Sequence, residues 1–418
     1  MSLSLRVVLA LLVVSLFALG VTGNALYSQL VYLWVFLLVG SWLWTRLSLR
    51  GLHAQRRTRL HRAQSGQVFT EQFDIRNASR FPILWLEVRD RSKLPGARGS
   101  RVFTRIGGQQ SQFYLSRTRL SHRGIFPLGP TELVAGDVFG LFQVSLTIPV
   151  QESLLVYPYM VDVNAFPNPP GLLPGGEALR RKTHQVTPNA SSVREYAPGD
   201  ALNRIHWAST ARRSRLMVKE FELDPRADVW IFCDSARDVQ AAMPYTPSAD
   251  VGSLLLESSG NTALPPSTEE YEVSVAASLA RYYIKLGRAV GFVSHGQSLH
   301  LLPPDRGPRQ LGKILETLAL SQAVGEVAFS ELISAHARHL PRGSIVVLVS
   351  PSTSTDIAVS VDHIARMSLR PVVILLDAAS FGGSPGVDEL AISIRSLAVP
   401  VSLVENGTNL EEALSKWE

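Results

Sequence analysis

The chain has 418 residues and a formal net charge of +6, but the positive charge is concentrated at its start. Residues 1–70 contain seven arginines, no lysine and no acidic residue, so the rest of the chain sums to −1. A body this close to neutral lacks the basic surface that a phosphate backbone requires, which excludes a nucleic-acid-binding protein. The single cysteine, Cys233, excludes an internal disulfide and is expected to be a buried strand residue.

The first 48 residues are predicted to form a transmembrane helical hairpin. No side chain between Val7 and Thr45 is charged, and a single membrane-spanning helix needs only roughly 20 apolar residues. The pair Gly23-Asn24 interrupts this stretch with a turn signal, which divides it into two spans. A secretory signal peptide is the alternative for the first span. A second apolar segment follows at once, however, where a cleavage site and polar sequence would be expected.

The arginines around the two spans predict their orientation. One arginine precedes the first span and six follow the second, between Arg46 and Arg62. Positively charged flanks stay on the cytoplasmic side, so we expect a two-pass protein of the inner (cytoplasmic) membrane with both termini and the soluble domains in the cytoplasm. The basic juxtamembrane segment, residues 49–64, either contacts anionic lipid headgroups as well or serves only to set this topology.

Residues 65–162 have the pattern of an antiparallel β-sandwich. Runs of β-forming residues such as QVFTEQFDIRN, ILWLEVRD and QSQFYLSRTRL recur at short spacings and are separated by Gly, Pro, Asn and Ser. No long segment of helical periodicity interrupts them, which favours a sandwich. The following residues, 163–192, are rich in proline and glycine and are predicted to be a connector.

Residues 226–418 are predicted to form an α/β domain. Short apolar strands such as VWIFC, SIVVLVS and PVVILLD alternate with segments of helical periodicity. This alternation predicts a doubly wound parallel sheet with helices on both faces, and the uninterrupted apolar strands fit burial on both sides. Residues 239–268, a polar stretch between the first strand and the first helix, are expected to be a flexible insertion.

The most distinctive segment lies between these domains, at residues 193–225. It packs many charged side chains into VREYAPGDALNRIHWASTARRSRLMVKEFE. We expect a short helix with Asp200 as its N-cap, anchored to a core by Ile205 and Trp207. Arg194 and Arg204 are positioned to pair with a nearby acid. The segment is either a charged clasp that joins the two domains or a recognition surface for a partner protein.

This segment resembles the bacterial DUF58 family through the pattern R-x-Y-x-x-G-D-x-x-x-x-I-x-W-x-x-x-A-R and the following L-x-V-K-E-F-E. The matching residues are Arg194, Tyr196, Gly199, Asp200, Ile205, Trp207, Ala211, Arg212, Leu216, Val218 and Glu220. Upstream, SHRGIFPLGPTELVAGDVFGLF is similar to another segment of the family, with Val138 where proline is common. The expected interaction residues of the chain are Arg194, Tyr196, Gly199, Asp200, Arg204, Ile205, Trp207, Arg212 and Glu220.

The resemblance implies a von Willebrand factor A-like α/β domain after the signature. It also implies a MoxR-type AAA+ ATPase as a partner. The role that follows from the resemblance is that of a membrane-bound adaptor in protein assembly or envelope homeostasis.

The A-like domain raises the question of a metal ion. Such domains hold Mg²⁺ through D-x-S-x-S after their first strand, because Mg²⁺ prefers oxygen ligands in octahedral geometry. This chain reads Asp234-Ser235-Ala236-Arg237-Asp238, in which Ala236 offers no side-chain oxygen. Asp356 is the candidate for a later ligand, and the threonine of the family's site cannot be placed. We therefore expect a degenerate site, and no cofactor.

The leading hypothesis is a non-enzymatic adaptor or scaffold that has membrane lipid and a protein as its partners and no catalytic residue. Asp234, Ser235, Asp238 and Asp356 are expected at the carboxyl edge of the parallel sheet, where such sheets bind ligands. One alternative is a membrane-bound metal-dependent hydrolase acting at the same edge. Another is a structural envelope component without an ATPase partner. The oligomeric state is left open.

Overall fold

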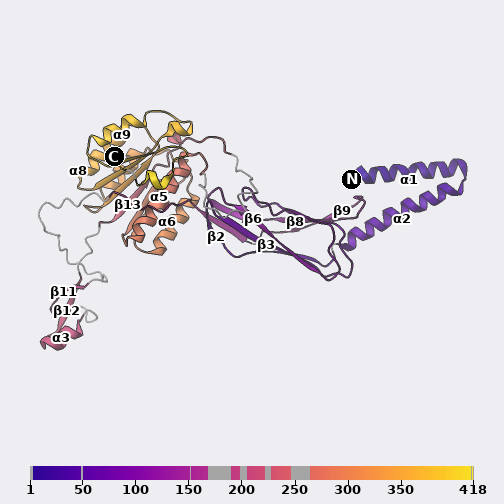
Figure 1. Ribbon diagram of the computed structural model, residues 1–418, viewed down its shortest axis with the longest axis horizontal. Helices are drawn as coiled ribbons and strands as arrows, with labels where there is room; N and C mark the ends of the chain where they lie inside the picture. Colours follow the sequence, from indigo (N-terminus) through magenta and orange to yellow (C-terminus); the bar gives the residue numbers. More distant parts are fainter. Residues whose placement is uncertain are drawn as a thin grey trace. The chain divides into compact units, whose positions relative to one another are not determined.

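The computed structural model describes residues 3–48, 50–150, 152–167, 190–197, 205–221, 227–245, 264–415 and 417. The chain divides into two compact units (Figure 1). Unit 1 comprises Met1–Val161, Ala242–Ala277 and Leu315–Gln322. Unit 2 comprises Asp162–Ala241, Ser278–Ile314 and Ala323–Glu418.

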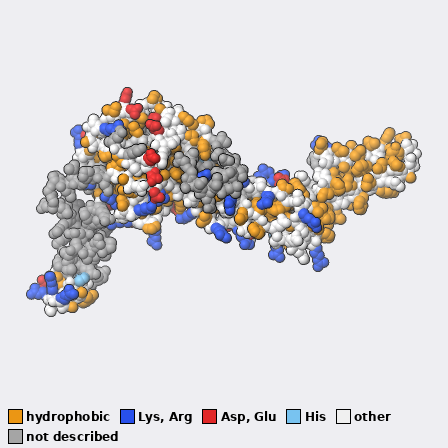
Figure 2. Space-filling view, in the orientation of Figure 1, with side chains coloured by type: hydrophobic (Ala, Val, Ile, Leu, Met, Phe, Trp, Pro, Cys, Tyr) orange, Lys and Arg blue, Asp and Glu red, His pale blue; other side chains and the backbone are white. Residues whose placement is uncertain are grey.

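Unit 1 begins with the two expected apolar helices, α1 (Leu3–Thr22) and α2 (Ala25–Ser48). Gly23 separates them with a φ of +62°, a left-handed conformation that glycine adopts without a steric penalty. Hydrophobic side chains cover the surface of this helical pair (Figure 2). Both helices are long and apolar enough to cross a membrane. They are therefore two candidate membrane spans.

The rest of unit 1 is rich in β-structure and mostly antiparallel. One sheet has the order β1 (Leu52–Thr58), β3 (Val68–Asn77), β6 (Ser111–Arg119). A second has the order β5 (Arg101–Phe103), β4 (Leu86–Asp90), β8 (Thr131–Gly136), β9 (Gln143–Ile148). The third has the order β2 (Arg62–Gln64), β10 (Glu152–Tyr157), β7 (Gly124–Leu128), and its β2–β10 pair is parallel.

Strand β3 shows why these sequences form sheets with one buried face. Its side chains alternate between exposed and buried, so that Phe69, Phe73 and Ile75 all point inward. Phe73 and Ile75 belong to a core cluster with residues of the β4 sheet. Phe69 belongs to a second cluster with residues of β10. The β1–β3–β6 sheet therefore contributes to two cores, each shared with a different sheet.

Strands β1 and β2 lie within residues 49–64, the expected basic juxtamembrane segment. Arg56 points into the fold with its side chain only 10 % exposed, and its Nε donates to Oε1 of Glu71 at 2.7 Å. Its Nη1 lies 3.0 Å from Oδ1 of Asp90. Burial raises the pKa of Glu71 more than the neighbouring Arg56 lowers it. The arginine looked like a surface residue because its two partners lie on other strands.

Unit 2 contains a six-stranded sheet in the order β15 (Leu299–Asp305), β14 (Val290–His295), β13 (Val229–Cys233), β16 (Ile345–Ser350), β17 (Arg370–Leu376), β18 (Val401–Val404). All neighbours are parallel except β14 and β15, which are antiparallel. The sequence did not indicate β15, because Pro303 and Pro304 lack the N–H groups of a central strand. An edge strand tolerates them.

Helices cover this sheet. On one face, α7 (Phe329–Ala337), α8 (Asp356–Arg366) and α9 (Val387–Arg395) form a core with strand residues such as Phe232 and Leu348. Every residue of β13 and β16 is buried, as expected for strands covered on both faces. Two longer helices, α5 (Thr268–Lys285) and α6 (Pro308–Leu320), contribute residues to both units. The short α10 (Leu410–Ala413) accepts a hydrogen bond from Ser402 of β18 at 2.8 Å.

Two expected irregular segments are described only in part. In the predicted connector, Phe166 is buried and packs edge-on against Tyr283 and Trp417, with centroid distances of 5.8 and 4.7 Å. In the predicted insertion, Ala242 and Ser267 form a β-bridge just before α5. The central part of each segment lies outside the described residues.

Candidate functional site

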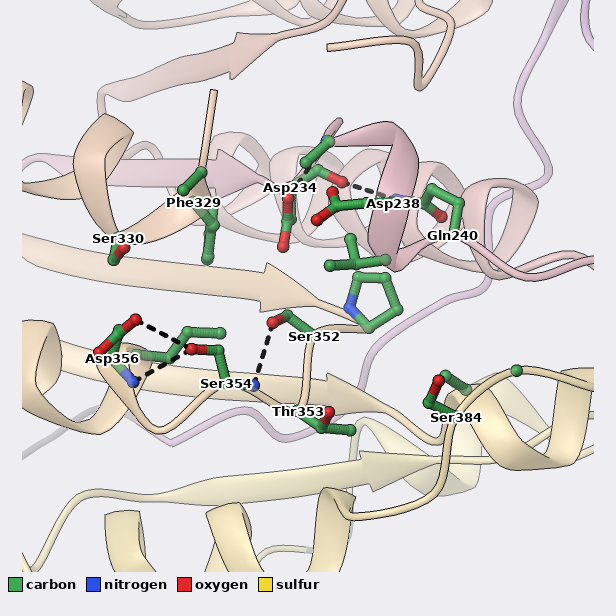
Figure 3. Close-up of a pocket in the computed structure, with 17 residues that line it drawn as sticks. Asp234, Asp238, Gln240, Phe329, Ser330, Ser352, Thr353, Ser354, Asp356 and Ser384 are labelled. Atoms are coloured by element: carbon green, nitrogen blue, oxygen red, sulfur yellow. Dashed lines mark hydrogen bonds between the residues drawn. The ribbon is translucent and has the colours of Figure 1, made fainter. Parts of the chain in front are cut away.

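A pocket of about 430 Å³ opens at the carboxyl edge of the six-stranded sheet (Figure 3). Its walls come from the segments that follow β13, β16 and β17, and from the start of α7. The polar side chains that line it are Asp234, Asp238, Gln240, Ser330, Ser352, Thr353, Ser354, Asp356 and Ser384. Carboxylates and hydroxyls therefore dominate its chemistry.

Asp234 is the most buried of these side chains, with 1 % of its surface exposed. Its Oδ2 accepts a 2.5 Å hydrogen bond from the Ser350 hydroxyl, and its Oδ1 accepts one from the Ala236 N–H at 3.2 Å. Burial raises the pKa of Asp234 to about 6, the two hydrogen bonds oppose this rise, and the nearby Asp238 adds to it. A carboxyl group that titrates near neutrality inside a pocket is typical of a functional site.

The loop after β16 is ordered by its own hydroxyls. Ser350 Oγ accepts from the Ser352 N–H at 2.9 Å, and Ser352 Oγ accepts from the Ser354 N–H at 3.2 Å. Ser354 Oγ in turn lies 3.2 Å from Oδ2 of Asp356, to which it donates. Hydroxyl-to-backbone bonds of this local kind stabilise turns. A row of serines thus extends from the buried Asp234 to the exposed Asp356.

Gly325 fixes the loop after β13, which carries Asp234 and continues into the short helix η2 (Arg237–Val239). Its N–H donates to the Ser235 carbonyl at 2.9 Å, and its carbonyl accepts from the Arg237 N–H at 2.9 Å. A Cβ atom at this position would lie 2.1 Å from the carbonyl oxygen of His295. Glycine is therefore required here by the close approach of three backbone segments.

Replacing Gly325 by alanine is expected to destabilise the protein by about 1–3 kcal/mol, because the backbone must shift to make room for the methyl group. The melting temperature of the full-length protein in detergent measures this loss. Gly312→Ala is the matched control, since a Cβ there meets nothing within 4 Å. In the interior of α6 that change should stabilise by roughly 0.5–1 kcal/mol. Equal melting temperatures for the two variants would contradict the proposed close contact.

The three expected metal-site carboxylates, Asp234, Asp238 and Asp356, do line one pocket. Each oxygen of Asp234 accepts one hydrogen bond, from the Ala236 N–H or from the Ser350 hydroxyl, and keeps a second lone pair. Within the described parts of the chain, no group of three or more His, Cys, Asp or Glu side chains is arranged to hold a metal. Ser235 contributes its backbone to the Gly325 contact and does not line the pocket.

Sequence reasoning missed the hydroxyls of the pocket. Thr353 lines it together with Ser352 and Ser354, and all three belong to the PSTST loop that follows β16. The composition of that loop was the available signal. What the sequence does not reveal is that Ser330, at the start of α7, and Ser384, from the segment after β17, face the same space.

The signature segment forms a small hairpin with a helix. Strands β11 (Ala190–Glu195) and β12 (Met217–Phe221) pair antiparallel, and the Tyr196 N–H donates to the Leu216 carbonyl at 2.8 Å. Strand β11 thus begins before the expected boundary at residue 193. Helix α3 (Trp207–Arg213) begins after His206, whose ring accepts from the Ser209 N–H at 3.1 Å.

Two expectations for the signature are wrong and several are untested. Ile205 is buried but lies in a β-bridge with Val218, not in the helix. Trp207 is 68 % exposed and so does not anchor the helix, because it sits on the outer side of the first turn. Arg212 is exposed as well. Gly199, Asp200 and Arg204, and the side chains of Arg194 and Glu220, lie outside the described residues.

Arg123, in the upstream segment SHRGIF, has a structural role that the sequence pattern did not indicate. The Arg123 side chain is 5 % exposed and forms ion pairs with Glu269, at 2.5 Å, and with Glu270, both in the first turn of α5. Its Nε and Nη2 donate to the carbonyls of Leu318 and Ser321, each at 3.0 Å. These carbonyls belong to the end of α6. One guanidinium therefore satisfies the acidic start of one helix and the carboxyl end of another.

Comparisons with known proteins agree with the resemblance in the signature. A family model described as "Protein of unknown function DUF58" matches residues 192–378, which include the signature and most of the pocket. The chain is similar to "Uncharacterized protein YeaD" of Bacillus subtilis (strain 168), with 25 % identity over 290 residues. That match covers 65 % of this chain and 63 % of the Bacillus protein, so the chain spans less than two thirds of its relative.

Similarity to solved structures is weak. A CARDB domain of the PF1109 protein from Pyrococcus furiosus aligns with a TM-score of 0.20 and 7 % identity, covering 25 % of this chain and 91 % of that domain. A GH20 exo-β-N-acetylglucosaminidase from Vibrio harveyi aligns with a TM-score of 0.18 and 6 % identity, covering 78 % of this chain and 57 % of the enzyme. Neither value supports an argument about fold or activity.

Proposed function

We propose that this protein is a membrane-anchored, non-enzymatic adaptor that binds a partner protein in the pocket at the carboxyl edge of its six-stranded sheet. The observation that carries the proposal is the composition of the pocket. Among the 17 described residues that line it are three aspartates and no lysine, arginine or histidine. Such a pocket attracts a positive charge and repels phosphate or carboxylate groups.

The ligand that fits best is a lysine or arginine side chain of a partner. Asp238 and Asp356 are exposed and can pair with it, while Asp234 is buried. The hydroxyls of Ser352 and Thr353 can accept hydrogen bonds from the same ammonium or guanidinium group. Ligands of open α/β sheets bind at this edge, beyond the carboxyl ends of the strands.

The remaining parts of the proposal rest on the sequence. The two candidate spans support a two-pass membrane anchor, and the flanking arginines support a cytoplasmic position for both termini and both soluble domains. Five parallel strands with one antiparallel edge strand support an A-like domain, and two sheets that share a core support a sandwich. A MoxR-type AAA+ ATPase as the partner, and a role in protein assembly or envelope homeostasis, rest on the family resemblance.

The alternative of a metal-dependent hydrolase is less well supported. It requires a divalent ion in the pocket, and Ala236 offers no side-chain oxygen where the D-x-S-x-S pattern has its first serine. A structural envelope component without an ATPase would leave an acidic pocket without a function. Both alternatives are outcomes of the experiment that follows.

A photo-reactive p-benzoylphenylalanine in place of Thr353 is expected to crosslink the full-length protein in its native membrane to one partner, an AAA+ ATPase. Thr353 is half-buried and lines the pocket. Adding Asp238→Asn and Asp356→Asn should abolish the adduct, because the charges that hold the basic side chain are gone. The same amino acid in place of Val359, which is 69 % exposed on α8 outside the pocket, is the control.

Several results would contradict the proposal. Equal crosslinking at both positions would show that the pocket has no specific partner. An adduct whose formation requires added Mg²⁺ would favour the hydrolase. A specific adduct that repeatedly contains no ATPase would keep the adaptor but remove the expected partner.

A further inference from the structure

In the loop between β8 and β9, several backbone N–H groups find their hydrogen-bond acceptors within the loop itself. The buried carboxylate of Asp137 accepts hydrogen bonds from three N–H groups, those of Phe139, Leu141 and Phe142, at 3.0, 3.3 and 2.7 Å. The Asp137 carbonyl also accepts from the Gly140 N–H at 3.3 Å, and Gly140 has a φ of +68° that favours glycine. The loop is therefore a turn whose backbone polar groups are hydrogen-bonded within it.

The tip of this turn exposes two large apolar side chains. Val138 is 62 % exposed and Phe139 is 58 % exposed, while Leu141, two residues further on, is 3 % exposed. Single exposed apolar residues are common on protein surfaces. Two neighbouring ones on a rigid tip, beside an apolar groove, form a contiguous patch of the kind that marks an interaction surface.

The groove beside the tip has a volume of about 360 Å³ and lies within unit 1. One wall is helix α2, and the other is the loop together with Leu84. Its lining residues are Phe36, Leu37, Gly40, Ser41, Trp44, Leu84, Asp137, Val138 and Phe139. The Asp137 carboxylate is occupied by backbone N–H groups, so the groove presents mainly carbon atoms.

The position of the groove along α2 indicates what fills it. The residues of its helical wall belong to the second candidate membrane span, Ala25–Leu47. Two residues beyond Trp44, the guanidinium of Arg46 lies 5.3 Å from the centre of the Trp42 ring, an arrangement suited to the headgroup level. The helix advances about 15 Å between Phe36 and Arg46, which is about half the thickness of a hydrocarbon core.

We propose that the Asp137–Phe142 loop is a second membrane contact, with Val138 and Phe139 entering the leaflet at the carboxyl end of α2. A phospholipid acyl chain occupies the groove between the loop and the helix. In lipid, every backbone polar group must find its partner within the protein, and the Asp137 carboxylate meets that demand for three N–H groups. The contact is distinct from the acidic pocket and depends only on α2 spanning the membrane.

The test places a fluorescent NBD label at the tip of the loop. Full-length protein with Cys233→Ala and Phe139→Cys is labelled and reconstituted into phosphatidylcholine–phosphatidylglycerol vesicles. A nitroxide attached near the start of the lipid acyl chain should quench the label, and aqueous iodide should not. Phe113→Cys, at a position 67 % exposed on β6, should show the reverse. Phe36→Cys, at a position 79 % exposed on α2, should be quenched in any case by a nitroxide attached near the end of the acyl chain, because it lies about 15 Å deeper than Arg46.

A second measurement, without the label, excludes the possibility that the apolar NBD group itself draws the loop into the membrane. The unlabelled Phe139→Cys variant in vesicles should lose its reaction with a charged thiol reagent, whereas the unlabelled Phe113→Cys variant should keep it. The proposal is overturned if position 139 behaves like position 113. It is also overturned if the label at 139 is shielded from iodide and nitroxide alike, because protein then covers the groove. If position 36 also escapes the nitroxide, the membrane anchor itself is wrong.

Discussion

Replacing Arg123 by methionine is expected to destabilise the protein by about 3–5 kcal/mol, the usual cost of breaking a buried charge network by removing one partner. The change leaves the Glu269 and Glu270 carboxylates without their ion pair, at side-chain exposures of 30 % and 19 %. It also removes the guanidinium donors of the Leu318 and Ser321 carbonyls, of which Leu318 keeps the Ser321 hydroxyl as a donor at 3.0 Å. Methionine keeps the apolar bulk of the side chain, so the loss reports the guanidinium and not a cavity.

The measurement is the melting temperature of the full-length protein in detergent. Arg123→Lys should recover only part of the loss, because an ammonium group cannot reach two carboxylates and two carbonyls in one plane. Arg281→Met is the matched control. Arg281 pairs at 3.2 Å with Asp162, whose side chain is 67 % exposed. The Arg281 side chain is 21 % exposed, but its partner lies mostly in solvent, so the pair should contribute less than about 1 kcal/mol. If Arg123→Met and Arg281→Met melt alike, the network does not stabilise the fold.

Replacing Asp234 by asparagine is expected to change stability in a way that depends on pH. The pKa of Asp234 is raised from 3.8 to about 6, so its contribution to stability is fully present below pH 3.8 and is lost as the pH rises through 6. This loss corresponds to about 3 kcal/mol, since tenfold in acidity is about 1.4 kcal/mol. Asparagine carries no charge at any pH. Relative to the native protein, the variant should therefore gain about 2 kcal/mol between pH 4 and pH 8, because pH 4 already lies just above the unfolded-state pKa of 3.8.

Only the difference between the two pH values is used, because any fixed cost of rearranging the hydrogen bonds cancels. Ser350→Ala provides a comparison of opposite sign. The Ser350 hydroxyl lowers the pKa of Asp234 by its hydrogen bond, so its removal should raise that pKa further and weaken the protein more at pH 8 than at pH 4. A native-to-asparagine difference that stays constant across this range would show that Asp234 does not titrate there.

The two Asp234 experiments also bear on the proposed function. An ionised aspartate that opposes folding near neutral pH is costly to keep unless its charge is used. A basic side chain of a partner entering the pocket would lower the pKa of Asp234 and recover part of that cost. Binding and stability should therefore be linked through this single carboxylate.

The expected elements that depend on local pattern are found in the structure. Strand β3 follows from the alternation in QVFTEQFDIRN, and α8 from the helical periodicity of IAVSVDHIARMSL. The convergence of Asp234 and Asp356 on one pocket also follows from the sequence, because carboxyl ends of parallel strands meet at one edge. These are properties that a few neighbouring residues determine.

What the sequence could not reveal depends on distant partners. Arg123 belongs to the upstream motif, yet its partners Glu269 and Ser321 lie 146 and 198 positions further along the chain. Arg56 reads as a juxtamembrane charge until Glu71 and Asp90 are placed beside it. Trp207 is the residue expected to anchor the signature helix to a core, but its side chain is 68 % exposed. In each case tertiary context overrides residue type.

The antiparallel strand β15 has a consequence for self-association. An open sheet edge invites strands from other copies, and exposed Leu299 and Leu301 would add to the attraction. Pro303 and Pro304 donate no hydrogen bond, and the register shift opposite Val290 and Phe292 twists the ladder at the same point. An incoming strand would therefore lose its pairing midway. The edge strand itself therefore opposes fibril growth from this side of the sheet.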